Sequence, residues 1–283
     1  MAASAVVAPL SASLGAPLGA QERLGPERQD IRNFGGDIWA AFTSPVHMSG
    51  TDAAVGLGGI ALVAVVSRAD SAVWEWMNGN PHALPLRAIS PIREGFRYHL
   101  YEMGSGQYIL PLSGVLYTAG RLSHDAGLRD AGLGCATGHL SSLGLREIAY
   151  HVVARDRPRD TDDPYRIDVP GRHQWSWQSF FSGHTANSMA CASFIGHRYS
   201  LGVFEAVPYA YSLAIGFGRM ADGRHWFSDT VTGALVGFAL GREIADRQLH
   251  RIGKPTKTLT GAPPGAPLNA RGSIPLFSWS ITF

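Results

Sequence analysis

Two histidines and an aspartate in the second half of the chain are suited to acid–base and nucleophilic chemistry. His225 and Asp229 are four residues apart, so on a helix they would share a face, and the carboxylate could accept a hydrogen bond from one imidazole nitrogen. The other nitrogen would then be a nucleophile. His184 follows a Ser-Gly pair, and a histidine there could give a proton to a leaving oxygen.

The residues around these groups are of the types that bind phosphate. Ser182 and Gly183 precede a run of helical composition over 185–194, and the N-terminus of a helix binds anions through its amides and dipole. Arg219 and Arg157 add planar, permanently charged groups that can bind phosphate oxygens in pairs. The sequence therefore predicts one phosphate-handling site.

The order and spacing of these residues resemble the type 2 phosphatidic acid phosphatase family, which includes bacterial acid phosphatases and vanadium haloperoxidases. The third family motif, Ser/Gly-Arg-x5-His-x3-Asp, is matched in full from Gly218 to Asp229. The second motif, usually Pro-Ser-Gly-His, is present as 181–184 with Phe181 in place of proline. The resemblance covers residues 105–243, and three ordered motifs are far more specific than one short pattern.

The first motif, Lys-x6-Arg-Pro, is incomplete. Arg157-Pro158 is present, but Tyr150 occupies the lysine position. A tyrosine hydroxyl can donate one hydrogen bond but brings no charge. Arg146, one helical turn earlier, and Arg155 are the two candidates to supply it.

The resemblance implies a role for each matched residue. His225 would attack phosphorus to form a phosphohistidine, Asp229 would orient it, and His184 would protonate the leaving alcohol and later activate water. The equatorial phosphate oxygens would be held by Arg157, Ser182, Gly183 and Arg219. No metal and no cofactor is implied.

Helical periodicity and length dominate the chain, and no alternating strand–helix pattern interrupts them. The expected fold is an all-α helical bundle of the phosphatase/haloperoxidase type, with one short C-terminal β-strand. The expected helices are 52–67, 70–78, 106–122, 126–154, 184–199, 203–218 and 225–246. The long polar and aromatic loop over 156–181 separates two motifs and is a candidate lid, with Trp175 and Trp177 lining a pocket or covering the bundle end.

Composition shifts divide the 283 residues into four segments. Residues 1–21 are small and apolar, as in a signal-peptide remnant, and residues 22–250 form the helical phosphatase domain, irregular up to residue 50 because of Gly35-Gly36 and Pro45. Residues 251–272 form a Gly/Pro-rich linker. In 273–283, apolar residues alternate with Ser and Thr, which predicts a strand with one apolar face.

The net charge and the hydropathy of the chain limit its possible partners and cellular location. The net charge of +2 and the absence of a long basic run exclude a nucleic-acid footprint. The most apolar run, 53–67, is shorter than the ~20 residues of a spanning helix, and the mean hydropathy is −0.00. We expect a cell-envelope protein that is periplasmic or membrane-associated, with an integral membrane protein as the alternative. Cys135 and Cys191 lie in apolar helical stretches, where free buried thiols are the default expectation, and an oxidising compartment would permit a bridge between them.

The sequence and the resemblance together predict a metal-independent phosphatase. It would hydrolyse phosphate monoesters or pyrophosphates, and the expected partner is a phosphorylated lipid, such as phosphatidic acid or an isoprenoid pyrophosphate, or a small phosphate ester. Two alternatives are a vanadate-dependent haloperoxidase and an envelope protein that only binds anions because Tyr150 replaces the motif lysine.

Overall fold

The computed structural model describes residues 26–47, 49–94, 102–167 and 178–253, and these residues are mostly helical. The bundle consists of α6 (Gly106–Leu122), α7 (Ala126–Val153), α8 (Gly183–Tyr199), α9 (Ala206–Ala221) and α10 (Phe227–Arg251). Earlier in the chain come α1 (Pro26–Thr43), α2 (Gly50–Val66), α3 (Asp70–Gly79) and α4 (Leu84–Glu94), with short 3-10 turns over Ser44–His47, Ser67–Ala69 and Gly202–Glu205. The all-α prediction is confirmed.

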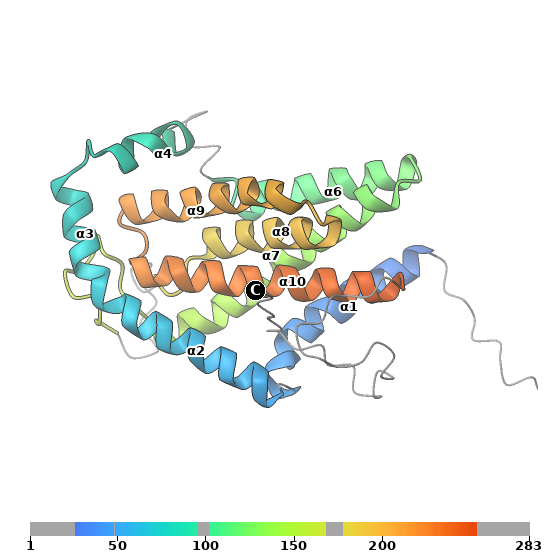
Figure 1. Cartoon of the computed structure of the whole chain (residues 1–283), viewed down its shortest axis with the longest axis horizontal. Helices are drawn as coiled ribbons and strands as arrows, with labels where there is room; N and C mark the ends of the chain where they lie inside the picture. Colours follow the sequence, from blue (N-terminus) through green and yellow to red (C-terminus); the bar gives the residue numbers. More distant parts are fainter. Residues whose placement is uncertain (1–25, 48, 95–101, 168–177, 254–283) are drawn as a thin grey trace, which may run out of the picture.

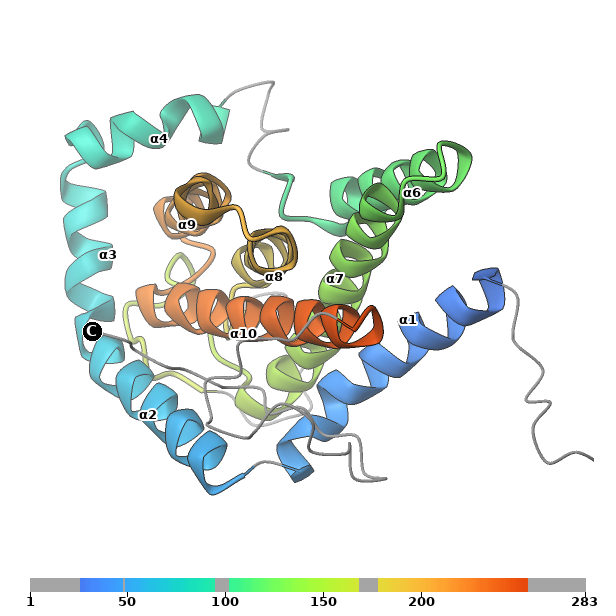
Figure 2. The same ribbon diagram turned by 45° about the vertical axis from the view of Figure 1, so that its right-hand side comes forward.

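The core of the bundle is the contact between α8 and α10, which is the most extensive helix pair in the molecule. Helices α7 and α9 pack on either side of α8, and α6 pairs with α7. Phe194 and Ile244 are completely or almost completely buried between these helices. Figure 2 shows α2, α3 and α4 as a curved arm that wraps around one side of α9 and α10.

Local sequence explains most helix boundaries. Ser49 caps α2 in a reciprocal capping box with Asp52, and Asp125 caps α7 by accepting from the amides of Gly127 and Leu128. Such caps satisfy amides that have no partner within the helix. The expected helix over 106–122 coincides with α6, and the helix expected over 126–154 ends one residue earlier.

Two predictions about the first hundred residues are wrong. The stretch before residue 50 was expected to be irregular, but α1 continues through Gly35-Gly36. Tertiary contacts outweigh the glycine cost there, because α1 packs on α7 and Asp37 receives hydrogen bonds from Arg247 and Arg251 of α10. Helix α4 was absent from the expected helices; its buried Leu86 packs with Met77 of α3 and Met220 of α9.

Cys135 of α7 and Cys191 of α8 form a disulfide, with their Cα atoms 4.5 Å apart. The expectation of free thiols is therefore wrong. Both residues lie in helical stretches that predict burial, but only the packing of α7 against α8 brings the two sulfur atoms together. The expected C-terminal strand, the N-terminal segment 1–21, and Trp175 and Trp177 lie outside the described residues.

Candidate active site

Four chain segments meet where the bundle core ends. Residues 154–167 follow α7, Ser182 stands at the N-cap of α8, Arg219 lies in the last turn of α9, and His225 lies in the turn that leads into α10. The amide of Ser182 donates to the carbonyl of Asp229 over 3.0 Å. This bond ties the start of α8 to the first turn of α10 and so joins the second motif to the third.

His225 is almost fully buried, with 2% of its surface exposed. Its Nδ1 atom lies 2.7 Å from the backbone carbonyl oxygen of Ser179. Because a carbonyl can only accept, Nδ1 carries the hydrogen and Nε2 has the lone pair. Burial, and next the charge of Arg219, lower the pKa of His225 well below its ordinary value. The ring is therefore neutral at neutral pH, which is the state that a nucleophile requires.

Asp229 does not contact His225 in the way that the spacing predicted. Its carboxylate accepts from Arg155 Nη1 at 2.6 Å, from Ser179 Oγ at 2.5 Å and from the amide of Trp226 at 2.9 Å. The four-residue rule fails because α10 begins at Phe227, so His225 precedes the helix and the carboxylate caps the helix start instead. Asp229 thus acts on His225 through Ser179, which bonds both residues.

Arg155 is held by structural contacts within the protein. Its guanidinium donates to both Asp229 and Asp70, at 2.6 and 2.7 Å, and also to the Ser228 hydroxyl and the Pro164 carbonyl. It neutralises two buried carboxylates, and truncating one partner of such a pair leaves an uncompensated buried charge. Four of the five N–H groups of Arg155 thus donate to protein oxygens and its charge offsets buried carboxylates, which disfavours the sequence-based possibility that it replaces the motif lysine.

His184 forms a pair that sequence reasoning missed. Its Nε2 donates to Glu102 over 2.9 Å, and the other carboxylate oxygen of Glu102 lies 3.5 Å from Arg219 Nη1. The hydrogen bond to His184 lowers the pKa of Glu102. Burial lowers the pKa of His184, and the Glu102 bond opposes that shift. No motif spacing links two residues 82 positions apart, so the sequence held no signal for this contact.

The predicted phosphate-binding residues gather around the two histidines. Ser182 is completely buried, and its hydroxyl lies 2.9 Å from that of Thr185. Arg157 and Arg219 are both buried, and their charges both lower the pKa of His225. Burial lowers the pKa of Arg157 to about 10, so that it stays protonated at neutral pH. The structure therefore brings together seven residues that the motifs singled out: Arg157, Ser182, Gly183, His184, Arg219, His225 and Asp229.

Tyr150 also faces this group. Burial raises its pKa, while the charges of Arg146, Arg157 and Arg219 act in the opposite direction. The phenol is therefore neutral at neutral pH. Within the described ranges 26–47, 49–94, 102–167 and 178–253, no cluster of three or more His, Cys, Asp or Glu side chains could hold a metal ion.

Comparison with known proteins identifies the class. Residues 132–249 match the family model of the PAP2 superfamily, the type 2 phosphatidic acid phosphatases. The predicted resemblance is thus confirmed.

Two particular proteins are similar to the chain. The lipid A 1-phosphatase of Porphyromonas gingivalis is 35% identical over 65 residues, which are 22% of this chain and 15% of that protein. A transmembrane PAP2-type phosphatidylglycerolphosphate phosphatase from Bacillus subtilis has a TM-score of 0.51 at 19% identity, with 71% of this chain and 96% of that chain covered. The second likeness shows a shared fold.

The arm contains one stretch that is long and apolar enough to cross a membrane. Because α2 and α3 follow each other through a short 3-10 turn, Gly50–Gly79 forms 30 helical residues, and its most apolar window has a mean hydropathy of 1.6 with 6% of it buried. Length and composition alone are weak evidence for a span. In the structure the helix continues beyond the apolar run 53–67, through Arg68 and into α3.

Proposed function

We propose that the protein is a metal-independent phosphatase that hydrolyses a lipid phosphate monoester or pyrophosphate through a phosphohistidine at His225. The observation that carries the proposal is the hydrogen bond from His225 Nδ1 to the Ser179 carbonyl, which leaves the Nε2 lone pair for phosphorus. A buried, neutral imidazole with cationic Arg157 and Arg219 nearby favours attack on an anion.

The reaction would proceed in two displacements. In the first, Nε2 of His225 bonds to phosphorus, the bond from phosphorus to the leaving oxygen breaks, and His184 gives that oxygen a proton. In the second, His184 takes a proton from water, the water oxygen bonds to phosphorus, and the P–N bond breaks. Inorganic phosphate leaves, and both imidazoles return to their initial states.

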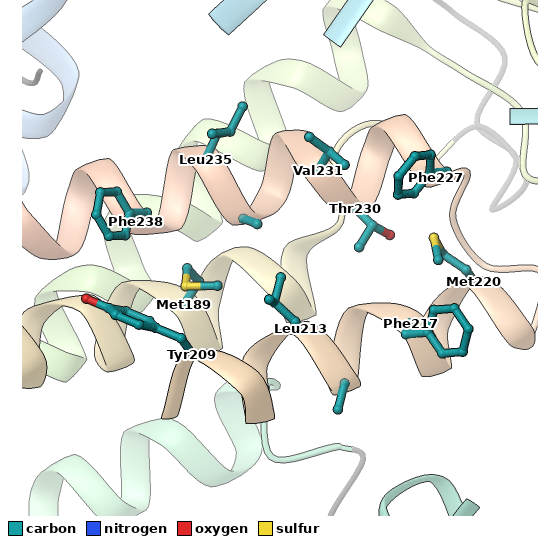
Figure 3. A pocket seen from close by; sticks show the side chains of 12 residues that line it. Met189, Tyr209, Leu213, Phe217, Met220, Phe227, Thr230, Val231, Leu235 and Phe238 are labelled. Carbon is teal, nitrogen blue, oxygen red and sulfur yellow. The ribbon is translucent and has the colours of Figure 1, made fainter. Parts of the chain in front are cut away.

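A long apolar groove supports a lipid substrate. It has a volume of about 620 Å³ and lies between α9 and α10 above α8. Figure 3 shows Phe217, Met220 and Phe227 at one end, with Tyr209 and Phe238 at the other. Met220 and Phe227 also line a small cavity that contains His225. The groove thus shares two lining residues with the cavity that His225 lines, and we propose that an acyl or isoprenoid chain attached to the phosphate lies in the groove.

The arm supports a location at a membrane of the cell envelope. Along α2, the side chains of Leu57, Ile60 and Val65 are each about two-thirds exposed. An apolar surface of this extent is typical of a protein that contacts other proteins or lipid. We propose that α2 lies against or in the bilayer, close to the lipid substrates. Release of the protein from membranes by detergent and not by high salt would support this placement, and release by salt alone would contradict it.

Hydrolysis assays test the proposed chemistry. The purified protein should release phosphate from para-nitrophenyl phosphate and, with a lower KM, from phosphatidic acid or an isoprenoid pyrophosphate in micelles. Vanadate should inhibit both reactions, and denaturation at alkaline pH after labelled substrate, which preserves the acid-labile P–N bond, should trap phosphate on His225. Bromide oxidation by peroxide and vanadate without phosphate release would identify a haloperoxidase instead. Phosphate binding without either reaction would identify an anion-binding protein.

A groove variant separates a lipid substrate from a soluble one. Leu213 lines the groove on α9 and its side chain is half-exposed, so Leu213→Asp should be tolerated by the fold. This variant should raise the KM for the lipid while leaving that for para-nitrophenyl phosphate unchanged. Leu122→Asp, at the exposed end of α6, is the matched control. Equal effects of Leu213→Asp on both substrates would show that the groove does not hold the lipid chain.

A further inference from the structure

The first motif lacks its lysine, yet a cation occupies the neighbourhood that the lysine would serve. We propose that Arg146 binds the substrate phosphate in place of the lysine missing at Tyr150. This inference deepens the proposed function and rests on it, because it adds a phosphate-binding residue to the same site. It requires the guanidinium to reach the anion site from one helical turn before the motif position.

Tyr150 and Glu147 fix the direction of the Arg146 side chain. Arg146 and Tyr150 share a face of α7, and the guanidinium carbon lies 5.2 Å from the centre of the Tyr150 ring. This is the geometry of a cation–π contact. Glu147 holds Nη2 at 2.6 Å. Tyr150 therefore occupies the lysine position, and its ring packs against the guanidinium of Arg146 from the preceding helical turn.

The far end of the Arg146 side chain rests on the second motif. A Cβ atom placed on Gly183 would lie 2.6 Å from Cδ and 2.8 Å from Nη1 of Arg146. Any residue other than glycine at this position would therefore displace the arginine. Gly183 is the first residue of α8, so the guanidinium lies against the helix N-terminus, where backbone amides and the helix dipole favour an anion.

Arg146 keeps donors for a ligand. Nε is buried without a hydrogen-bond partner among the described residues, and the one hydrogen bond of the guanidinium to those residues comes from Nη2. Since a buried donor without a partner is costly, a bound oxyanion would satisfy it. Arg155 contrasts sharply, because Nε, Nη1 and Nη2 all donate to protein oxygens.

The electrostatic effects of Arg146 extend across the site. Its positive charge contributes to the lowered pKa of His184 and opposes the raised pKa of Tyr150. The Arg146 charge thus acts on two residues of the candidate site. The side chain of arginine is longer than that of lysine, and its guanidinium can bind two phosphate oxygens with parallel donors. This length and geometry explain how an arginine can act from position 146 where a lysine would act from position 150.

Binding of inorganic phosphate, measured by titration calorimetry, tests the role of Arg146 without requiring turnover. Arg146→Gln should weaken phosphate binding by about ten- to a hundredfold, the loss expected for one charge-assisted contact. Arg146→Gln combined with Tyr150→Lys should recover most of that loss, because a cation returns at the motif position. Arg129→Gln, a half-exposed arginine on the same helix that pairs with Asp130, should bind phosphate like the wild type.

The outcomes separate this inference from the proposed function. If Arg146→Gln, with a native circular dichroism spectrum, binds phosphate like the wild type, the inference is wrong. Arg146→Met, which keeps the stem that packs on Tyr150, repeats the test should the glutamine variant not fold. If the wild type binds phosphate, Arg146→Gln does not, and no phosphate ester is hydrolysed by either, Arg146 is an anion ligand and the proposed phosphatase function fails.

Discussion

Two glycine-rich helices of this protein use glycine in opposite ways. On α10, Gly233, Gly237 and Gly241 face α8 at successive turns, and a Cβ on any of them would collide with a backbone carbonyl oxygen of α8. On α2, by contrast, Gly56, Gly58 and Gly59 have no atom within 4 Å of a Cβ position. The glycines of α10 are required by close packing inside the molecule, and those of α2 are not.

The contrast between α10 and α2 shows which region determines the geometry of the candidate site. Close contact of α8 with α10 holds Ser182 against Asp229, and therefore sets the positions of the second and third motifs. Helix α2 touches the rest of the described chain mainly through α10, and its aliphatic side chains point outward. We therefore expect changes in the bundle core to alter catalysis and folding, and changes on α2 to alter association with a membrane.

Removal of the nucleophile should have the largest effect. His225→Ala should abolish turnover, with a loss of at least about a thousandfold, because no other group can accept the phosphoryl group. The fold should survive, and circular dichroism with steady-state assays of para-nitrophenyl phosphate provides the measurement. A folded variant that keeps even a tenth of the wild-type activity would contradict the phosphohistidine mechanism.

Charges on the outer face of α2 should affect membrane binding alone. In Leu57→Asp/Ile60→Asp, each carboxylate in the bilayer would cost about 2.5–3.5 kcal/mol near the centre of a spanning helix. Sedimentation with lipid vesicles should show the variant in the supernatant, and its kcat on para-nitrophenyl phosphate should be unchanged. If the variant sediments with the vesicles as the wild type does, α2 is not the membrane contact.

A pair of glycine substitutions compares the two helices directly. Gly237→Ala should destabilise the protein by about 1–3 kcal/mol, because the new methyl group collides with the Ala186 carbonyl. Gly58→Ala should be neutral or stabilising by up to about 1 kcal/mol, since alanine favours a helix and nothing obstructs it there. Melting temperatures of both variants give the result. Equal effects would show that the α8–α10 contact is looser than described.

The smallest expected effect is a shift in the pH dependence of kcat/KM caused by a change at Glu102, which precedes α6. Glu102 raises the pKa of His184 through its hydrogen bond and charge. Because His184 must be protonated to act as the acid, activity falls as pH rises through its pKa. Glu102→Gln should lower that pKa and move the alkaline limb of kcat/KM to lower pH. An unchanged limb would mean that another group donates the proton.

Much of this architecture was predictable because it depends on local patterns. Helical periodicity and caps located α6 to within its observed bounds and α7 to within one residue. Where local signals opposed the outcome, prediction failed. Gly35-Gly36 indicated a break, but Asp37 anchors α1 to Arg247 in a distant part of the chain. Contacts across so many residues leave no trace in a single short window of sequence.

The sequence by itself determined which residues are candidates for the chemistry and their order along the chain, since three motifs single out the two histidines, the aspartate and the proposed phosphate ligands. Tertiary structure alone decided how they work together. It turned Asp229 from His225 toward Ser179 and Arg155, and brought Glu102 to His184. The reason is geometric. Spacing along a helix shows which side chains share a face, whereas the packing of helices decides what that face meets.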